Sequence, residues 1–316
     1  MSNRKYIVIR RIIEVILTVV FVTFLSFLLI RLSPIDPATA YAKRHTPSPS
    51  QEQIAQLRIE MGLDKPLIVQ YGMWLEDALS LDFGISLVNG KDAFGEMAQV
   101  LPMTIKVVLL SSVMQIFFSI LAANLMYLGR KNWSGQCLKF LLLLLVSIPP
   151  FYIANSYLNF FAVQTDIISV TENTGFIRYL NPAICLSIPY VAFYGRMLYT
   201  TLCKEMNEDY AFYARCRGLS ENRILFLHAT PRACISILPN FMQSLGLTMA
   251  GAAFVERIFS LPGLGYLIIE SVLHRDSPMV HLCVLVLALT IASVGVLADL
   301  IQYFLNRKKY GGALNR

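Results

Sequence analysis

Two glycine-rich stretches contain residue types that could bind phosphate groups, but neither fits a known motif. The run from Gly84 to Asp92 carries two glycines and a lysine in the order of a phosphate-binding loop. Such a loop needs four residues between its glycines and a Ser or Thr after the lysine, whereas this run has five residues and then an aspartate. The run from Pro262 to Gly265 lacks the third glycine of a dinucleotide fingerprint. We therefore predict no nucleotide site in this chain.

Metal ligands and catalytic nucleophiles also lack a recognisable pattern. The histidines His45, His228, His274 and His281 have no ligand spacing, no H-E-x-x-H motif occurs, and the six cysteines form no C-x-x-C pair. We interpret His281 as an ordinary histidine near a membrane interface. The expectation is a chain with no catalytic residue, no bound cofactor and no metal site.

The elements that carry these residues are strongly apolar. Of the 316 residues, 56% are hydrophobic and 15% are charged, and the mean hydropathy is +0.57, whereas soluble domains carry about 25% charged residues. Because a helix crosses a bilayer with about 20 apolar residues, we predict an all-α integral membrane protein with six transmembrane helices. The runs are 12–30, 107–128, 140–163, 179–203, 233–255 and 279–298, and prolines within them (Pro149, Pro150, Pro189 and Pro239) predict kinked or broken helices.

The distribution of positive charge predicts the orientation. With six spans, the side that holds both termini has 17 lysines and arginines and the other side has nine, so the termini are expected in the cytoplasm. The first apolar run is longer than a signal-peptide core, although Ala40-Tyr41-Ala42 imitates a cleavage site, and we interpret it as a retained helix. The predicted parts are 1–32 (N-terminus and first helix), 33–99 (extracytoplasmic segment), 100–305 (membrane core) and 306–316 (cytoplasmic tail).

A charged stretch, Glu208–Pro239, interrupts the membrane core between two apolar runs. Charges alternate with aromatic residues at helical spacing, Ser220 is expected to cap a second short helix, and Pro231 is expected to end that helix. Such a surface cannot lie in lipid but is tied at both ends to segments that must. We predict a cytoplasmic docking element through which a partner moves the membrane helices.

Several spans also carry polar side chains, which either line a translocation path or join helices by hydrogen bonds. The candidates for the path are Gln115, Asn124, Asn155, Asn159 and Gln243. Lys106, near an outer helix end, is expected to extend its side chain to the interface.

Five stretches resemble the B-type permease subunit of the peptide and nickel branch of bacterial ATP-binding-cassette (ABC) importers. They span nearly the whole chain in the family's order. The stretches are Arg10-Arg11 followed by LLIRLSPIDPA, GLDKPLIVQYGMWL with LDFGIS, Leu101-Pro102-Met103-Thr104, Tyr213–Leu219, and FVERIFSLPGLG at Phe254–Gly265. The resemblance implies the type I importer permease fold in the bacterial cytoplasmic (inner) membrane, with a second homologous permease subunit, two ATPase subunits that use ATP and magnesium, and an extracytoplasmic substrate-binding protein.

The resemblance also implies roles for two sets of residues. Residues 205–232 correspond to the family's ATPase-coupling segment, in which Ala214 and Gly218 match the motif; the candidates are Glu208, Tyr210, Tyr213, Ala214, Arg215, Arg217, Gly218, Leu219 and Arg223. The outer turn before the sixth span is a candidate gate or a plain interhelical turn, and its candidates are Glu256, Arg257, Pro262, Gly263 and Gly265. The chain departs from the family at Tyr213, Pro231-Arg232 and Lys106.

The substrate is less closely defined. Residues 46–86 look more like nickel permeases than dipeptide permeases, so we expect nickel or another transition metal carried as a chelate or metallophore, with di- or oligopeptides as the alternative. Two other classes of protein remain open: an ATP-independent channel and, disfavoured by the lack of a catalytic motif, a membrane enzyme.

Overall fold

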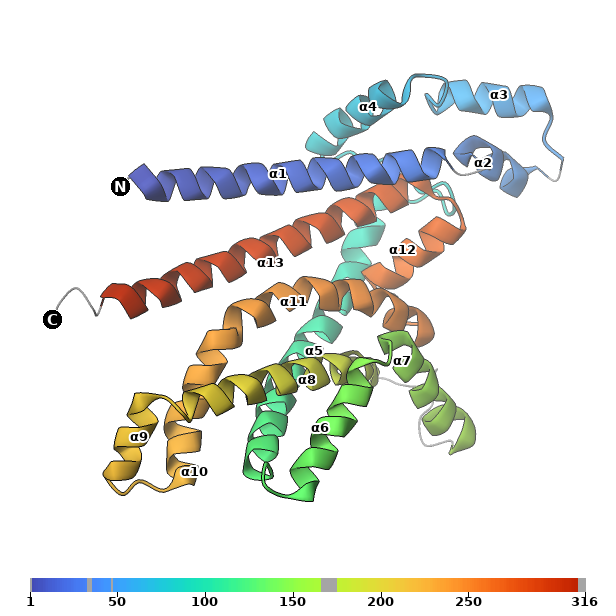
Figure 1. Ribbon diagram of the computed structural model, residues 1–316. Helices are drawn as coiled ribbons and strands as arrows, with labels where there is room; N and C mark the ends of the chain where they lie inside the picture. The colour runs from blue at the N-terminus through green and yellow to red at the C-terminus, as the bar shows by residue number, and fades with distance from the viewer. Residues whose placement is uncertain (1, 33–35, 47, 166–174, 312–316) are drawn as a thin grey trace. The chain divides into compact units, whose positions relative to one another are not determined.

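The computed structural model describes residues 2–32, 36–46, 48–165 and 175–311, and this part of the chain consists of helices joined by turns and loops (Figure 1). It contains no β-strand, and only an isolated bridge joins Ile85 to Asp92. The chain forms two compact units. The first consists of Met1–Thr104 and Leu261–Ala292, and the second consists of Ile105–Ser260 and Ser293–Arg316.

The first unit combines one long helix with several short ones. It contains α1 (Ser2–Arg31), α2 (Pro37–His45), α3 (Gln51–Glu60), α4 (Leu67–Leu79), α12 (Leu264–Leu273), the start of α5 (Ala93–Leu128) and most of α13 (Ser277–Gly311). The short helices have strong start signals. Asp36 accepts a hydrogen bond from the Thr39 amide at the start of α2, and Ser50 and Gln53 form a reciprocal capping box at the start of α3.

His281 lies in the interior of this unit, and its interpretation as an ordinary histidine near a membrane interface stays a prediction. Its ring stacks on Phe27 at a centroid distance of 3.7 Å, and its Nδ1 lies 3.2 Å from the Ser26 hydroxyl. Tyr71 of α4 packs edge-on against Phe27, and its hydroxyl lies 2.8 Å from that of Thr23. The aromatic residues around the histidine come from α1 and α4, which are distant from α13 in sequence, and residue order alone does not reveal this contact.

The second unit is a helical bundle. It contains the remainder of α5 and α13, α6 (Trp133–Val146), α7 (Pro150–Leu158), the π-helix η1 (Asn159–Gln164), α8 (Ile177–Glu205), α9 (Asp209–Cys216), α10 (Glu221–Ile224), the π-helix η2 (Leu225–Ala229) and α11 (Thr230–Ile258). α8 packs against both α6 and α11. Ala40-Tyr41-Ala42, which imitates a signal-peptide cleavage site, lies within α2. Lys106 lies on α5, and its ammonium group is 5.4 Å from the centre of the Tyr179 ring.

Proline breaks one of the predicted spans. The sequence predicts a kink or break at Pro149 and Pro150 within the run 140–163, and this is confirmed, because α6 and the helix that follows it meet at an angle of 99°. Pro149 occupies the N-cap position of α7 and Pro150 its first turn, where the missing proline N–H leaves no hydrogen bond unmade. Pro189 and Pro239 instead lie inside the continuous helices α8 and α11.

By length and composition, four of the described helices can cross a membrane, or five if the bent pair counts as one span. The four are Arg10–Arg31, Ala93–Leu128, Glu221–Ile258 and Ser277–Tyr303. α8 is long enough but carries Arg178, Arg196 and Lys204. The structure therefore supports a multi-pass helical membrane protein, and the number six stays a prediction.

The turn between α5 and α6 depends on two glycines in very close contact. A Cβ atom placed on Gly135 would lie 2.3 Å from the carbonyl oxygen of Gly129, and one on Gly129 would lie 3.0 Å from the Gly135 backbone. No L-residue with a side chain fits at Gly135 without moving the chain, so this pair sets how tightly α5 and α6 are joined.

Candidate functional site

The predicted coupling segment forms a helix–turn–helix between α8 and α11. α9 and α10 lie side by side where α8 ends (Figure 1). The turn between them is a Schellman motif, in which the Gly218 amide donates to the Arg215 carbonyl at 2.9 Å and the Leu219 amide donates to the Ala214 carbonyl at 3.1 Å. Gly218 has φ +80°, a conformation that glycine adopts far more readily than other residues.

The start of the second helix agrees only in part with expectation. Ser220 occupies the N-cap position of α10, but its side chain makes no capping hydrogen bond. Pro231 does not end the helix, because it lies in the first turn of α11 directly after η2, and the helical path runs on to Ile258. A proline ring clashes with the carbonyl four residues earlier in an α-helix. The widened turns of a π-helix give a physical reason why the helix continues past this proline.

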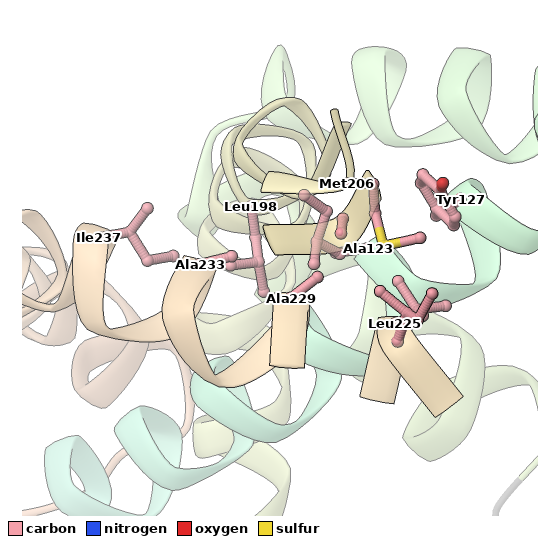
Figure 2. Packing of buried hydrophobic residues seen from close by; sticks show 11 residues of the cluster. Ala123, Tyr127, Leu198, Met206, Leu225, Ala229, Ala233 and Ile237 are labelled. Carbon is pink, nitrogen blue, oxygen red and sulfur yellow. The ribbon is translucent and has the colours of Figure 1, made fainter. Parts of the chain in front are cut away.

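The inner side of the segment is bound to the bundle by a group of apolar residues that we call the Leu198 cluster (Figure 2). Its buried members come from α5, from α8 and the residue that follows it, and from every helix of the segment: Ala123, Tyr127, Leu198, Leu202, Met206, Ala211, Ile224, Leu225, Ala229, Ala233 and Ile237. Full burial of a residue such as Ile224 or Leu225 stabilises the fold by about 1.5–3 kcal/mol. A force on α9 and α10 therefore reaches α5, α8 and α11 through direct packing.

Polar contacts stiffen the same segment. Nε of Arg215 lies 2.6 Å from Oε1 of Glu221, which bridges α9 and α10, and Nη2 donates to the Met206 carbonyl at 2.8 Å. Tyr210 donates to Glu205 at 3.0 Å, and the Arg232 guanidinium lies 3.9 Å from the centre of its ring. Burial, together with the acceptor Glu205, raises the pKa of Tyr210 to about 12, so this hydroxyl stays a donor at physiological pH.

The structure divides the nine predicted coupling residues into two groups. Tyr210, Ala214, Arg215 and Leu219 are half-buried and hold the segment together, whereas Glu208, Tyr213, Arg217, Gly218 and Arg223 are exposed.

The coupling segment also exposes three large apolar side chains that sequence reasoning missed. Phe212, Phe226 and Leu227 are 60%, 50% and 61% exposed. Large apolar residues close to charged ones in this stretch of the sequence were the available signal. The segment thus exposes apolar side chains as well as the basic Arg217 and Arg223.

The residues of the candidate outer gate belong to different units. Glu256 and Arg257 end α11 in the second unit, where Glu256 is fully buried and Arg257 is exposed. Pro262, Gly263 and Gly265 belong to the first unit and lead into α12, for which Gly263 is the N-cap residue.

Gly263 has no side chain that could cap the start of α12. The capping group comes from another of the family-like stretches. Thr104, the last residue of Leu101–Thr104, accepts a hydrogen bond from the Leu264 amide at 2.7 Å. The contact lies within the first unit, and both atoms are buried. The structure thus joins two of the family-like stretches, and Thr104 is a site residue that sequence reasoning did not select.

The predicted path-lining residues also divide into groups. Asn124 is buried, donates to the Ile120 carbonyl and accepts from Thr230 at 2.9 Å, so it joins α5 to the start of α11. Gln115 is buried and donates to Ser111 at 3.0 Å. Asn155, Asn159 and Gln243 are exposed on the chain. Asn124 therefore fits the alternative in which polar side chains join helices. Of the five candidates, Asn155, Asn159 and Gln243 are the ones whose side chains are accessible to a substrate or to a neighbouring subunit.

The loop that imitates a phosphate-binding motif instead binds a carboxylate of the same chain. Gly84 and Gly90 both have positive φ, and the loop closes through the Ser86 amide and the Lys91 carbonyl at 2.9 Å. Asp276 is buried and accepts from the Ser86 hydroxyl and from the Leu87 amide, the latter at 3.0 Å. Within the described residues, no three His, Cys, Asp or Glu side chains come together as a metal site.

Two family models match the chain over most of its length. Residues 90–309 match the model described as a binding-protein-dependent transport system inner membrane component, and residues 5–108 match the N-terminal part of such a membrane component.

Curated relatives agree in length. The chain is 30% identical to the metal-staphylopine import system permease protein of Staphylococcus aureus, over 93% of this chain and 95% of the relative. It is 30% identical to a putative peptide transport system permease protein of Brucella suis, over 93% and 96%. It is 26% identical to the glutathione transport system permease protein of Escherichia coli, over 95% and 97%.

Proposed function

Since this chain belongs to the family of binding-protein-dependent transport system inner membrane components, the permeases of peptide- and nickel-type ABC importers, we propose that it forms half of a translocation path. The other half is a second homologous permease subunit. Two ATPase subunits hydrolyse ATP with magnesium on the cytoplasmic side, and an extracytoplasmic protein delivers the substrate. The chain itself has a transport role rather than an enzymatic one.

The proposed topology has six spans with both termini in the cytoplasm of a bacterial cell. α8 then crosses the membrane despite its charges, the bent α6–α7 pair counts as one span, and residues 33–99 lie outside. The distribution of lysine and arginine supports this orientation.

The coupling segment is the observation that carries the proposal. Its inner side is fixed to three spans by the Leu198 cluster, and its outer side exposes Tyr213, Arg217 and Arg223. A partner that binds the exposed side moves the spans without any new contact inside the membrane, provided the bundle has two discrete packings.

Charge reversal at the exposed face tests the coupling role. Arg217→Glu is expected to reduce co-purification of the ATPase subunits and substrate uptake together, while membrane insertion stays normal. Lys43→Glu is a matched control, because Lys43 is exposed on α2, which belongs to the first unit and not to the coupling segment. Full ATPase retention and uptake in the Arg217 variant would contradict the assignment.

We propose a transition-metal chelate, such as nickel bound to a metallophore, as the substrate, with di- or oligopeptides as the second candidate. The nickel-permease-like stretch in residues 46–86 and the metal-staphylopine relative support the first, and the peptide and glutathione relatives support the second. Uptake of a nickel chelate and of a dipeptide, compared in a deletion strain complemented with this chain, distinguishes them.

A further inference from the structure

A groove of about 670 Å³ lies between α6 and α8, in the second unit. Each helix contributes a stripe of side chains at helical spacing. The α6 stripe contains Gln136, Lys139 and Leu143, and the α8 stripe contains Phe193, Arg196 and Thr200. Residues three, four and seven positions apart share one face of a helix, so the groove runs along both helices.

The two stripes place polar and apolar side chains at opposite ends of the groove. α6 and α8 run in opposite directions in the proposed topology. Gln136 and Thr200 therefore lie at the cytoplasmic end. Lys139 and Arg196 lie one turn deeper, and Leu143 and Phe193 lie deepest in the membrane. Trp133, at the start of α6, is 83% exposed, as is typical of an interfacial anchor. Lys139 follows six residues later, about 9 Å along the helix axis.

The two cations differ in how they are satisfied. The Lys139 ammonium donates to the Tyr199 hydroxyl at 2.7 Å and also lies 4.3 Å from the centre of that ring. Arg196 is exposed, and its guanidinium makes no hydrogen bond or ion pair with the described part of the chain. The side chains described as lining the groove include no Asp or Glu. The groove therefore holds two positive charges and no carboxylate among its described lining side chains, which favours an anionic group.

We propose that this groove binds an anionic phospholipid of the cytoplasmic leaflet, with its phosphate between Lys139 and Arg196 and an acyl chain along Phe193 and Leu143. Arginine pairs with phosphate through its planar fork of donors, and lysine adds a point charge. The apolar end of the groove matches the acyl chain in polarity. The proposal rests on the orientation given above, in which α6 begins and α8 ends at the cytoplasmic surface.

The test is lipid retention measured by native mass spectrometry of the full importer, released from membranes that contain phosphatidylglycerol and phosphatidylcholine. We expect preferential retention of phosphatidylglycerol. Removal of one cation by Lys139→Gln or Arg196→Gln is expected to weaken retention about fivefold, and removal of both about 30-fold. The control pair Lys131→Gln with Lys204→Gln removes the same charge from exposed positions outside the groove and is expected to leave retention unchanged.

A photocrosslinker in place of Phe193 gives a second readout that needs no charge substitution. Crosslinking to phosphatidylglycerol supports the proposal, and crosslinking to another protein chain overturns it. Equal retention by the wild type and the double variant would also overturn it, as would equal loss in the control pair. Displacement of the lipid by millimolar glycerol 3-phosphate would show a site for soluble phosphates and refute the lipid assignment.

The lipid result and the transport result are separable. Failure of the proposed function would appear as absent ATPase retention or uptake, with lipid binding unaffected. An impermeant thiol reagent that labels Lys131→Cys only in inverted vesicles reports the orientation independently. Labelling from the outside would overturn the cytoplasmic-leaflet assignment.

Discussion

Gly218, in the turn between α9 and α10, offers a graded test of how the coupling segment is built. Its φ of +80° lies in the left-handed region, and a Cβ atom added there would meet no atom within 4 Å. The cost of a side chain at this position is therefore conformational and not steric. Its amide also donates to the Arg215 carbonyl at 2.9 Å, and proline would remove that donor.

These two facts predict an ordered series of substitutions. Gly218→Asn is expected to cost least, because Asn tolerates the left-handed conformation. Gly218→Ala is expected to cost about 1–2 kcal/mol, and Gly218→Val more, because its branched Cβ is less tolerant of that conformation. Gly218→Pro fixes φ near −65° and loses the hydrogen bond, so it is expected to cost about 3 kcal/mol or more.

The assay is ATPase retention on the purified complex, followed by substrate uptake, with membrane insertion measured in parallel. Retention should fall in the order Asn, Ala, Val, Pro, while insertion stays constant because the apolar runs that direct it are unchanged. Gly72→Ala is the control, since Gly72 lies within α4 in an ordinary conformation with open space around it. Equal retention in the Asn and Pro variants would refute the reasoning.

Three further predictions concern stability. Gly135→Ala is expected to lower the melting temperature of the purified protein by creating a clash worth about 1–3 kcal/mol or more, whereas Gly295→Ala, which meets no atom within 4 Å, should not; an unchanged Gly135 variant would contradict the tight turn. Thr104→Val should cost about 1 kcal/mol by removing the cap on Leu264, with Thr104→Ser close to wild type; equal melting temperatures for Val and Ser would contradict the capping role. Burial raises the pKa of Asp36, but hydrogen bonds from Thr39 and Arg58 outweigh burial and hold it below the ordinary value, so its stabilising contribution is complete above a pH of about 4 and is lost as the pH falls through the folded-state pKa. Asp36→Asn should therefore reduce the fall in melting temperature between pH 5 and pH 3. The same fall in the variant and the wild type would contradict this role of Asp36.

The helical class and the position of the coupling segment follow directly from residue order. Long apolar runs specify membrane helices whatever their neighbours are, and a charged stretch between two of them must leave the lipid. Gly218 is similarly local, because the helix end and the glycine that terminates it are adjacent in sequence.

Contacts between distant segments were beyond that reasoning. Asn124 looked like a path-lining residue, but its partner Thr230 lies on another helix, and only packing brings the two together. The sequence likewise gives no sign that Ser26 and Phe27 of α1 contact His281. Periodicity gives the face of a helix but not the helix that covers it.

One local rule about proline was overridden by its context, and another was obeyed. Pro231 was expected to end a helix, but the preceding π-turns accommodate its ring and the helix continues. At Pro149-Pro150 the local rule holds, because the run 140–163 is bent there by 99°, as the sequence predicts. A proline in sequence indicates a lost hydrogen bond, and the neighbouring turns decide whether the helix bends or continues.

The central claim, that this chain transports only when ATPase subunits drive it through the α9–α10 segment, is tested most directly by uptake into proteoliposomes. Uptake of the nickel chelate and of a dipeptide is measured for the complete importer with binding protein and ATP, and for the two permease subunits alone. The account predicts ATP-dependent uptake of one substrate by the complete importer and none by the permeases alone. Substrate flux through the permeases alone would contradict it and indicate a channel.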